Sequence, residues 1–169
     1  MNPQVSFVDE VSDPEAFHAL LVDYYSIVLQ TLVAAGGPQL SPVEMADGSI
    51  KSLDQMLPPQ GRLALARDES GRLIGCGALL RIRPDAVEMK RMFVRPEAQG
   101  TGLGRTLFEM RLDEARAMGC TSVYADTARG NRSMLAMYEK HGFQYIDRYP
   151  ENANPPELAP YLVFLEYRL

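Results

Sequence analysis

Residues 87–104 read Val-Glu-Met-Lys-Arg-Met-Phe-Val-Arg-Pro-Glu-Ala-Gln-Gly-Thr-Gly-Leu-Gly, so a strand-like run feeds directly into a glycine-rich turn. An amphipathic helix is predicted to follow over about 102–118. Its apolar side would carry Leu107, Phe108, Leu112, Ala115 and Met118. Glycines let the backbone approach a ligand closely, and the first N–H groups of a helix have no partners within the helix. Those donors and the positive end of the helix dipole predict a site for a phosphate-bearing cofactor, bound by the backbone.

The composition is that of one soluble globular domain of 169 residues, with 46% hydrophobic and 23% charged residues. The net charge of -5 argues against nucleic-acid binding, which needs a basic surface, and suits a cationic partner such as an amine. Cys76 and Cys120 have no paired spacing. They therefore indicate a reducing compartment, and we expect them to pack as apolar side chains rather than to act as catalytic thiols.

The N-terminal region favours a cytoplasmic location. Residues 1–6 lack the basic flank and the apolar segment of a signal peptide. The apolar stretch 19–35 is interrupted by Asp23, Ser26, Gln30 and Thr31, so we do not expect it to supply the roughly 20 apolar residues of a membrane span. No membrane partner and no nucleic-acid partner is expected.

The pattern along the chain predicts a mixed α/β fold, with a central twisted sheet of about six to seven strands flanked by about four helices. Strands are predicted over 5–8, 62–67, 73–82, 86–94, 122–126, 144–147 and 161–167, and helices over about 13–35, 41–57, 102–118 and 131–141. Gly48 weakens the second helix, which is open to being broken in two. The strands 86–94 and 122–126 should be parallel because a helix crosses between them. Residues 149–160 contain four prolines and are expected to form a loop.

Two apolar stripes define the expected inner faces of the first two helices. The first stripe consists of Phe17, Leu21, Tyr24, Val28 and Leu32, and the second of Val43, Ala46, Ile50, Leu53 and Leu57. Their spacing of three or four residues is typical of helices that pack on a core.

Three motifs together resemble the GNAT superfamily of N-acetyltransferases. Gln99-Gly-Thr-Gly102-Leu-Gly104 fits its Gln/Arg-x-x-Gly-x-Gly/Ala pyrophosphate motif, and Met92-Phe-Val-Arg-Pro-Glu-Ala is a common lead-in. Asn131 followed by Met137-Tyr-Glu-Lys-His-Gly-Phe143 is similar to the Asn…Leu-Tyr-Glu-Lys-x-Gly-Phe segment, with methionine in place of leucine. The likeness covers residues 62–169 well and 1–60 only in the order of elements. It implies one GNAT-like domain over 1–169, with acceptor-side helices at 13–57, a cofactor-binding core at 62–145, and a C-terminal loop and strand at 146–169.

The resemblance implies acetyl-coenzyme A (acetyl-CoA) as the acetyl donor and a primary amine as the acceptor. The pantetheine arm would lie along Met92, Phe93 and Val94, and Asn131 would contact it from the other side. The pyrophosphate would lie beyond Gln99 on the amides of Gly100, Thr101, Gly102, Leu103, Gly104 and Arg105. No metal is expected, since the sequence holds two isolated histidines and no clustered carboxylates. A homodimer is compatible with the resemblance because dimers are common in the superfamily.

Two residues are candidates for catalysis. An amine must be neutral to attack a thioester, and deprotonating one with a pKa of about 10.4 at pH 7 costs about 4.6 kcal/mol, so a base is useful. Glu88 lies eleven positions before Gln99, the spacing of the glutamate base in similar enzymes, although it could instead form an ion pair with Lys90 or an arginine. Tyr138 matches the general acid that assists the leaving thiolate. Asp126 would either bind the acceptor or cap a turn, the second being favoured.

Acceptor recognition is expected from the first two helices and the proline-rich loop. Carboxylates and aromatic rings there would suit a cationic amine, and the candidates are Asp23, Tyr24, Tyr25, Glu44, Asp47, Asp54 and residues 149–160. His141 is expected to have a structural role at a helix end, and His18 to be solvated.

The favoured function is acetyl transfer from acetyl-CoA to a primary amine of a small metabolite, by direct attack in a ternary complex. The alternatives are acetylation of a protein lysine or N-terminus, and a non-catalytic acyl-CoA-binding sensor. A dinucleotide-binding turn is disfavoured because Arg105 occupies the position of its third glycine. A nucleoside-triphosphate loop is excluded because no Gly-Lys-Ser/Thr follows.

Overall fold

A computed structural model describes residues 2–169 and shows a seven-stranded mixed sheet between two layers of helices. The strands are β1 (Gln4–Val8), β2 (Gly61–Arg67), β3 (Leu73–Arg83), β4 (Ala86–Val94), β5 (Ser122–Ala128), β6 (Gln144–Ile146) and β7 (Leu162–Arg168). The helices are α1 (Pro14–Ala34), α2 (Pro42–Lys51), α3 (Leu103–Ala117) and α4 (Arg132–Lys140), with three short 3-10 helices, η1 (Leu53–Met56), η2 (Pro96–Ala98) and η3 (Pro156–Tyr161). The predicted mixed α/β fold is confirmed.

The helices begin where the sequence predicts them. The Asp13 side chain accepts a hydrogen bond from the Ala16 N–H at 3.0 Å at the start of α1, and Ser41 does the same for Glu44 at the start of α2. The predicted second helix is indeed broken, since α2 ends at Lys51 and η1 follows it. The proline-rich segment is not wholly irregular, because its last part and Tyr161 form η3.

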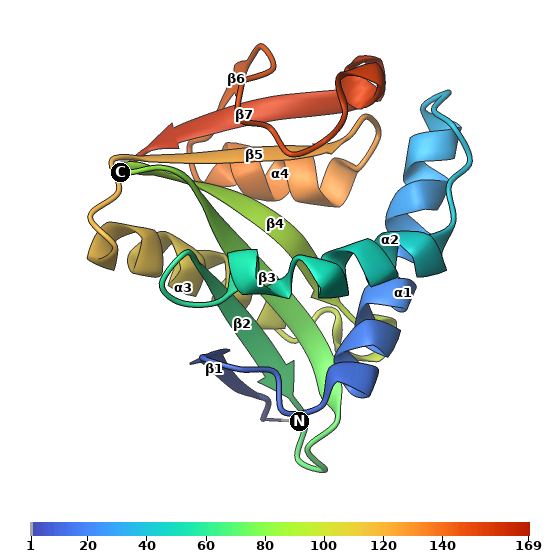
Figure 1. Cartoon of the computed structure of the whole chain (residues 1–169), viewed down its shortest axis with the longest axis vertical. Helices are drawn as coiled ribbons and strands as arrows, with labels where there is room; N and C mark the ends of the chain where they lie inside the picture. The colour runs from blue at the N-terminus through green and yellow to red at the C-terminus, as the bar shows by residue number, and fades with distance from the viewer. Residues whose placement is uncertain (1) are drawn as a thin grey trace.

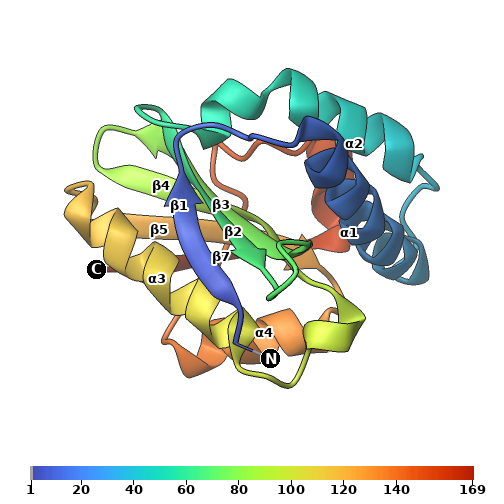
Figure 2. The ribbon, with the colours of Figure 1, turned by 90° about the horizontal axis from the view of Figure 1, so that it is seen from below.

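The order of strands in the sheet is β1-β2-β3-β4-β5-β7-β6, with α1 and α2 on one side and α3 and α4 on the other (Figure 2). All neighbouring pairs are antiparallel except β4 and β5. That parallel pair, joined by α3, is in register only from Ala86↔Ser122 to Met89↔Ala125. Beyond Met89 the two strands separate, which leaves a split in the middle of the sheet (Figure 1).

The predicted stripes of α1 and α2 are partly wrong. α1 buries Leu20, Tyr25 and Leu29 together with three predicted positions, whereas Tyr24 and Val28 are only partly buried, on the wall of a cavity that Tyr25, Leu29 and Leu32 also line. In α2 and η1 the buried residues are Ala46, Ser49 and Met56, and Val43 is 50% exposed. The inner face of α1 is shared between the core and the cavity at the split, and helical periodicity alone does not separate the two.

α1 also corrects the expectation about membrane spans. At 21 residues it is long and apolar enough, by length and composition, to cross a membrane. In this fold six of its side chains are buried, and Phe17, Leu20 and Leu21 are fully inaccessible to solvent. The apolar composition of α1 is therefore explained by its packing in the core and along the cavity.

Candidate active site

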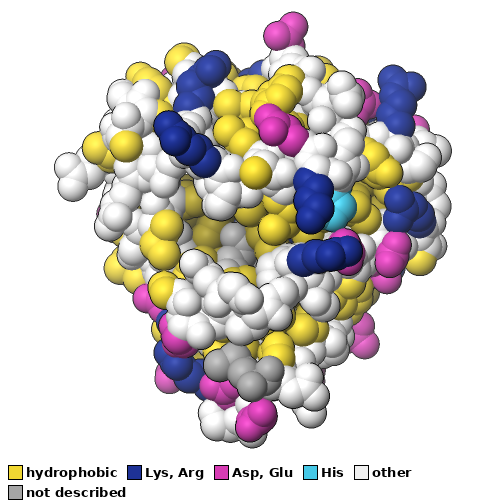
Figure 3. All heavy atoms as spheres, turned by 180° about the vertical axis from the view of Figure 1, so that it is seen from behind, with side chains coloured by type: hydrophobic (Ala, Val, Ile, Leu, Met, Phe, Trp, Pro, Cys, Tyr) yellow, Lys and Arg dark blue, Asp and Glu magenta, His cyan; other side chains and the backbone are white. Residues whose placement is uncertain are grey.

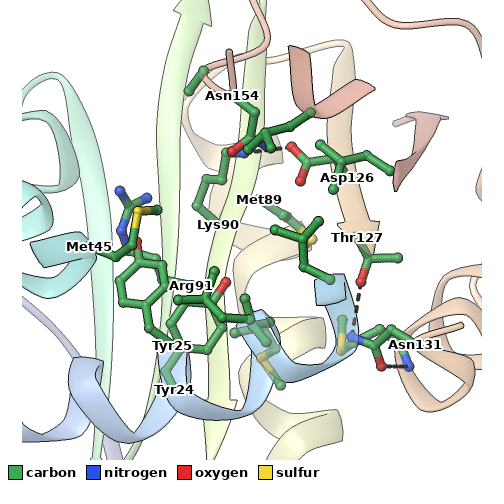
Figure 4. Close-up of a pocket in the computed structure, with 18 of the residues that line it drawn as sticks. Tyr24, Tyr25, Met45, Met89, Lys90, Arg91, Asp126, Thr127, Asn131 and Asn154 are labelled. Atoms are coloured by element: carbon green, nitrogen blue, oxygen red, sulfur yellow. Dashed lines mark hydrogen bonds and ion pairs between the residues drawn. The ribbon is translucent and has the colours of Figure 1, made fainter. Parts of the chain in front are cut away.

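A cavity of about 250 Å³ occupies the split between β4 and β5 (Figure 4). Its walls come from both helical layers, with Tyr24, Tyr25 and Met45 from α1 and α2, and Met134 and Tyr138 from α4. Residues 153–155, Leu158 and Leu162 also line the cavity. The cavity thus connects the α1 side of the sheet with the α4 side.

The glycine turn, predicted to be a cradle for pyrophosphate, lies at the start of α3. Gly100 and Gly102 have φ of 78° and 88°, values that L side chains rarely adopt. A Cβ built on either glycine meets no atom within 4 Å, so the space above the turn is open. Gly102 is the N-cap of α3 and contributes no side-chain bond, and the first turn of α3 carries no acidic residue. Free amides and the absence of a negative charge suit a pyrophosphate.

The open edge of β4 leads from this cradle to the cavity. The Arg95 N–H donates to Ile74 O at 2.8 Å, so by alternation the peptide groups of Met92 and Val94 face away from β3, toward the split. The Gln99 side chain donates from Nε2 to Val94 O at 3.0 Å and thereby ties the turn to the strand. This edge has the geometry that an extended, amide-containing arm needs for strand-like pairing.

The molecular surface has a depression that suits such a ligand. On the face opposite to that of Figure 1, hydrophobic side chains line the floor of a central hollow, and Lys and Arg side chains lie along part of its rim (Figure 3). Arg105 itself pairs with Glu109 at 2.7 Å and is largely exposed, so the cradle depends on backbone groups.

The other residues predicted to bind the cofactor have structural contacts of their own. Asn131 caps α4 by accepting from Met134 N and lines the cavity, where its Nδ2 donates to the Thr127 hydroxyl at 3.0 Å. The Thr101 hydroxyl donates to Ala98 O at 2.7 Å. Leu103 and Phe93 are buried, and a Cβ built on Gly104 would lie within van der Waals distance of the side chains of Met92, Val94 and Met137.

Tyr138, the predicted general acid, lines the cavity from α4. Its ring packs against Phe108 and Phe143, and only 3% of the residue is exposed. Burial raises the pKa of the Tyr138 phenol above its usual value, with a smaller opposing effect from Arg111. The hydroxyl is therefore protonated at neutral pH and can donate a hydrogen bond.

Glu88 lies behind the cavity wall rather than on it. The residue is fully buried, and its Oε2 accepts hydrogen bonds from the Tyr149 hydroxyl and from Asn152 Nδ2 at 3.2 Å. Its Oε1 lies 3.1 Å from Lys90 Nζ, which is the ion pair foreseen as the alternative role. Tyr149 and Asn152 come from the segment before η3, so this segment closes Glu88 off.

Asp126 is the carboxylate that lines the cavity, and Figure 4 shows it beside Lys90. Its Oδ2 lies 2.5 Å from Lys90 Nζ and accepts from Asn152 Nδ2 at 2.7 Å. The turn-capping role favoured from the sequence is wrong, because β5 continues to Ala128 and Asp126 pairs in register with Phe164 inside the sheet. Asn152 joins the two carboxylates, since it contacts both Glu88 and Asp126.

Lys90 is held in its charged form by these neighbours. Burial by itself would lower the pKa of Lys90, but the adjacent carboxylates Asp126 and Glu88 outweigh it, and the pKa is raised. Lys90 is therefore a fixed cation at neutral pH and not a base.

The expected acceptor carboxylates lie elsewhere. Asp23 pairs with Arg95, and Asp47 lies 2.8 Å from His18, which is thus not simply solvated. Glu44 and Asp54 are not among the residues that line the cavity, whereas Tyr24 and Tyr25 are. His141 packs on Phe108 and bonds to Met137 O at 2.8 Å, a structural role as predicted. Within residues 2–169 no group of three or more His, Cys, Asp or Glu side chains could hold a metal ion.

Lys90, Arg91, Tyr149 and Asn152 were not identified as site residues from the sequence, although residues 149–160 were expected near the acceptor. Arg91 is the only non-glycine residue in 2–169 with a positive φ, 50°. It lies in a bulge of β4, where the register shifts between Cys76↔Phe93 and Ala78↔Lys90. As a result, the consecutive residues 89–92 all line the cavity, which a regular strand would not allow. The sequence carries no signal for this bulge except Gly77 on the facing strand.

The cradle, the open edge and the cavity form one continuous candidate site, and comparisons with known proteins identify the family. Residues 21–143 match the Acetyltransferase (GNAT) family, so the chain belongs to that family and is an acetyl-CoA-dependent acyltransferase. It is 37% identical over 115 residues, 68% of this chain and 72% of the relative, to an IAA acetyltransferase of Azospirillum brasilense.

Solved structures of acetyltransferases share the whole fold. An acetyltransferase from Streptococcus agalactiae superposes with a TM-score of 0.74 at 23% identity, over 98% of each chain. A GNAT family acetyltransferase from Elizabethkingia anophelis with acetyl-CoA bound gives a TM-score of 0.63 at 20% identity, also over 98% of each chain.

Proposed function

We propose that this acetyltransferase transfers acetyl from acetyl-CoA to a primary amine of a small metabolite, by direct attack in a ternary complex. The observation that carries the proposal is the cavity through the split sheet. It brings Tyr138 from one side and Asp126 from the other to the open edge of β4. A named relative, the IAA acetyltransferase, supports acetyl transfer to a small molecule.

Each part of the chain has a role in this proposal. Residues 13–57 and the segment leading to η3 form the acceptor side, and the core of 62–145 binds the cofactor. The amides at the start of α3 hold the pyrophosphate, while the peptide groups of Met92 and Val94 pair with the pantetheine arm. Asn131 faces that arm from α4.

In this proposal, side chains of the protein accept the proton of the amine and orient the group that accepts it. The bound cofactor supplies a thioester carbonyl carbon, which the neutral amine attacks while the carbon–sulfur bond breaks. Asp126 accepts the proton of the incoming ammonium, because it is the carboxylate on the cavity wall. The second proton, which the nitrogen loses as the amide forms, passes through solvent to the departing thiolate. Glu88 acts from behind, by holding Lys90 and Asn152 so that Asp126 stays oriented.

Tyr138 assists the departing thiolate. Its raised pKa makes complete proton transfer to a thiolate with a pKa near 8.5 uphill by more than about 2 kcal/mol. Its contribution is therefore a hydrogen bond that stabilises the negative charge as the thiolate leaves.

The test is a thiol-release assay with acetyl-CoA and a panel of primary amines. Tyr138→Phe and Asp126→Asn should each lower kcat by about tenfold or more while CoA affinity changes less than about threefold. Glu88→Gln should lower kcat by less than Asp126→Asn. Tyr145→Phe, an exposed tyrosine of β6, is the matched control and should behave as wild type. Full turnover in both the Tyr138 and Asp126 variants would contradict these roles.

Two alternatives are separated by the same assay. A protein substrate would have to reach a cavity partly walled by Pro155 and Leu158, so we expect a peptide array to show little transfer. A non-catalytic sensor would bind CoA and release no thiol with any amine. Free, buried Cys76 and Cys120 support a cytoplasmic location, and light scattering would test for a homodimer.

A further inference from the structure

Arg91 presents an uncompensated positive charge to the acceptor side of the cavity. Its Nε donates to the Ser49 hydroxyl at 3.0 Å, and Ser49 is itself buried and bonded to the Tyr25 hydroxyl at 2.8 Å. No carboxylate of residues 2–169 lies within ion-pair distance of Arg91, in contrast to Arg83 and Arg95. The guanidinium is thus held at one nitrogen, and its two terminal nitrogens form no hydrogen bond with the described residues.

The bulge of β4 is the reason that Arg91 lies here. A φ of 50° costs a non-glycine residue roughly 1–2 kcal/mol, and such strained residues persist where the surrounding structure enforces them. The bulge places Arg91 on the cavity wall, where its guanidinium is bonded to Ser49 of α2, whereas the Lys90 ammonium is paired with Asp126 of β5. In Figure 4, Arg91 and Asp126 come from strands on opposite sides of the cavity.

The charges of the cavity match a zwitterion rather than a polycation. Its wall carries two cations, Lys90 and Arg91, and one carboxylate, Asp126. Lys90 is already paired with Asp126 and Glu88, so Arg91 is the cation left without a partner. A polyamine would place a second positive charge among these groups without a second exposed carboxylate to receive it.

Much of the remaining wall is apolar, although Thr127, Asn131 and Asn154 also line the cavity. Val28, Leu29 and Leu32 of α1 face Leu158 and Leu162 near the start of β7. The volume of about 250 Å³ lies below the roughly 300 Å³ at which pockets for drug-sized ligands begin. The acceptor is therefore a small molecule with an apolar part.

We infer that the acceptor is an amino acid with an apolar side chain, whose amine lies at Asp126 and whose free carboxylate binds the Arg91 guanidinium. This inference rests on the proposed acetyl transfer to a small amine. Arg91 can offer two parallel N–H donors to a carboxylate, an arrangement that gives direction as well as affinity. The aliphatic residues of α1 and η3 cover the side chain of the acceptor.

The experiment compares matched acceptors at saturating acetyl-CoA, with thiol release as the readout. Leucine, methionine and phenylalanine are each paired with the corresponding amide, and spermidine serves as the polycation. Wild type should prefer each acid over its amide by about tenfold or more in kcat/KM, because a site built for a polar group rejects the analogue that lacks it. Arg91→Met should lose that preference, because kcat/KM should fall by about tenfold or more for the acids and by less for the amides. Arg116→Met, an exposed arginine at the end of α3, is the control and should keep the preference.

The outcomes separate this inference from the proposed function. Thiol release with amides or spermidine at least as fast as with the acids would overturn the inference and leave acetyl transfer intact. Release with none of the amines would overturn the proposed function itself. A circular-dichroism melting curve of Arg91→Met shows whether the variant is folded, and the wild-type acid-to-amide ratio decides the question independently of any variant.

Discussion

The guanidinium of Arg111 fills the space that a side chain at Gly77 would need. A Cβ built on Gly77 would lie 2.8 Å from Arg111 Nε. Arg111 is fully buried without a carboxylate partner, and donates to Ala78 O at 3.2 Å and to Lys90 O at 3.4 Å. Gly77 and Arg111 together thus support the bulge of β4 that directs Arg91 into the cavity.

Gly77→Ala should therefore destabilise the protein. The added methyl group must displace a buried, fourfold-bonded side chain, and such overpacking typically costs about 1–3 kcal/mol. Gly48→Ala is the matched control, because Gly48 lies within α2 and a Cβ there meets nothing within 4 Å. That change should stabilise by about 0.5–1 kcal/mol. Urea unfolding measures both values, and equal stability of Gly77→Ala and wild type would contradict the packing described.

Lys90→Met should be strongly destabilising at pH 7. Removing the cation leaves Asp126 and Glu88 buried without their partner, which costs about 3–5 kcal/mol in comparable cases. Lys140→Met, at an exposed position, should change stability by less than about 0.5 kcal/mol. Denaturant midpoints give the comparison.

The stabilisation by the ion pairs of Lys90 with Asp126 and Glu88 should depend on pH. The pKa of Lys90 is raised in the folded state, so its contribution is complete below the unfolded pKa of about 10.4 and is lost as the pH rises through the higher folded value. The stability difference between wild type and Lys90→Met should therefore shrink above about pH 10.4. A difference that grew with pH there would show that the carboxylates do not hold the lysine charged.

Gly102→Ala should weaken CoA binding. A Cβ at φ of 88° strains the turn by roughly 1–2 kcal/mol and should shift the amides that we propose bind the pyrophosphate. Gly71→Ala is the control, because Gly71 has a φ of 85° in the turn between β2 and β3, also with nothing within 4 Å. Both variants should lose similar stability in urea, but only Gly102→Ala should lose CoA affinity by calorimetry. Equal CoA affinities of the Gly102→Ala and Gly71→Ala variants would show that the glycine turn does not bind the cofactor.

The two thiols should be inert in the native protein. Burial raises the pKa of Cys76 to about 12 and also raises that of Cys120. At pH 8 only about one part in ten thousand of the Cys76 thiol is then ionised, and thiolate is the reactive form. Incubation with a thiol reagent at pH 8 should leave activity unchanged, whereas unfolded protein should react at both cysteines. Rapid inactivation of the native enzyme would contradict this expectation and reopen a covalent mechanism.

Local patterns were sufficient for most of the fold. Capping at Asp13 and Ser41, the glycine turn before α3 and the alternation along β4 each depend on residues close in sequence, and the structure has these elements where they were predicted. The errors lie where two environments share one face. Helical spacing does not show that Tyr24 and Tyr25 both line the cavity, nor that Tyr25 is also buried and bonded to Ser49.

The environment of Glu88 depends on contacts between distant parts of the chain. Tyr149 and Asn152 are 61 and 64 residues away from it in sequence, and no pattern near residue 88 indicates that they cover the carboxylate. The bulge at Arg91 is similarly set by Gly77 and Arg111 on other elements. The spacing of the motifs predicted which positions, such as Glu88, match those of the family. The contacts of each side chain are set by tertiary packing and were not predictable from nearby residues.

The short parallel contact between β4 and β5 makes the protein two half-sheets, β1–β4 and β5–β7, joined by backbone pairing at only four residue pairs. A cofactor arm paired along the free edge of β4 would extend this short contact, which we call the seam. The bound ligand would then help to hold the two half-sheets together. We expect the seam to be more rigid while a cofactor arm is paired with β4 than after coenzyme A has left, because a bound ligand stabilises the elements that it contacts.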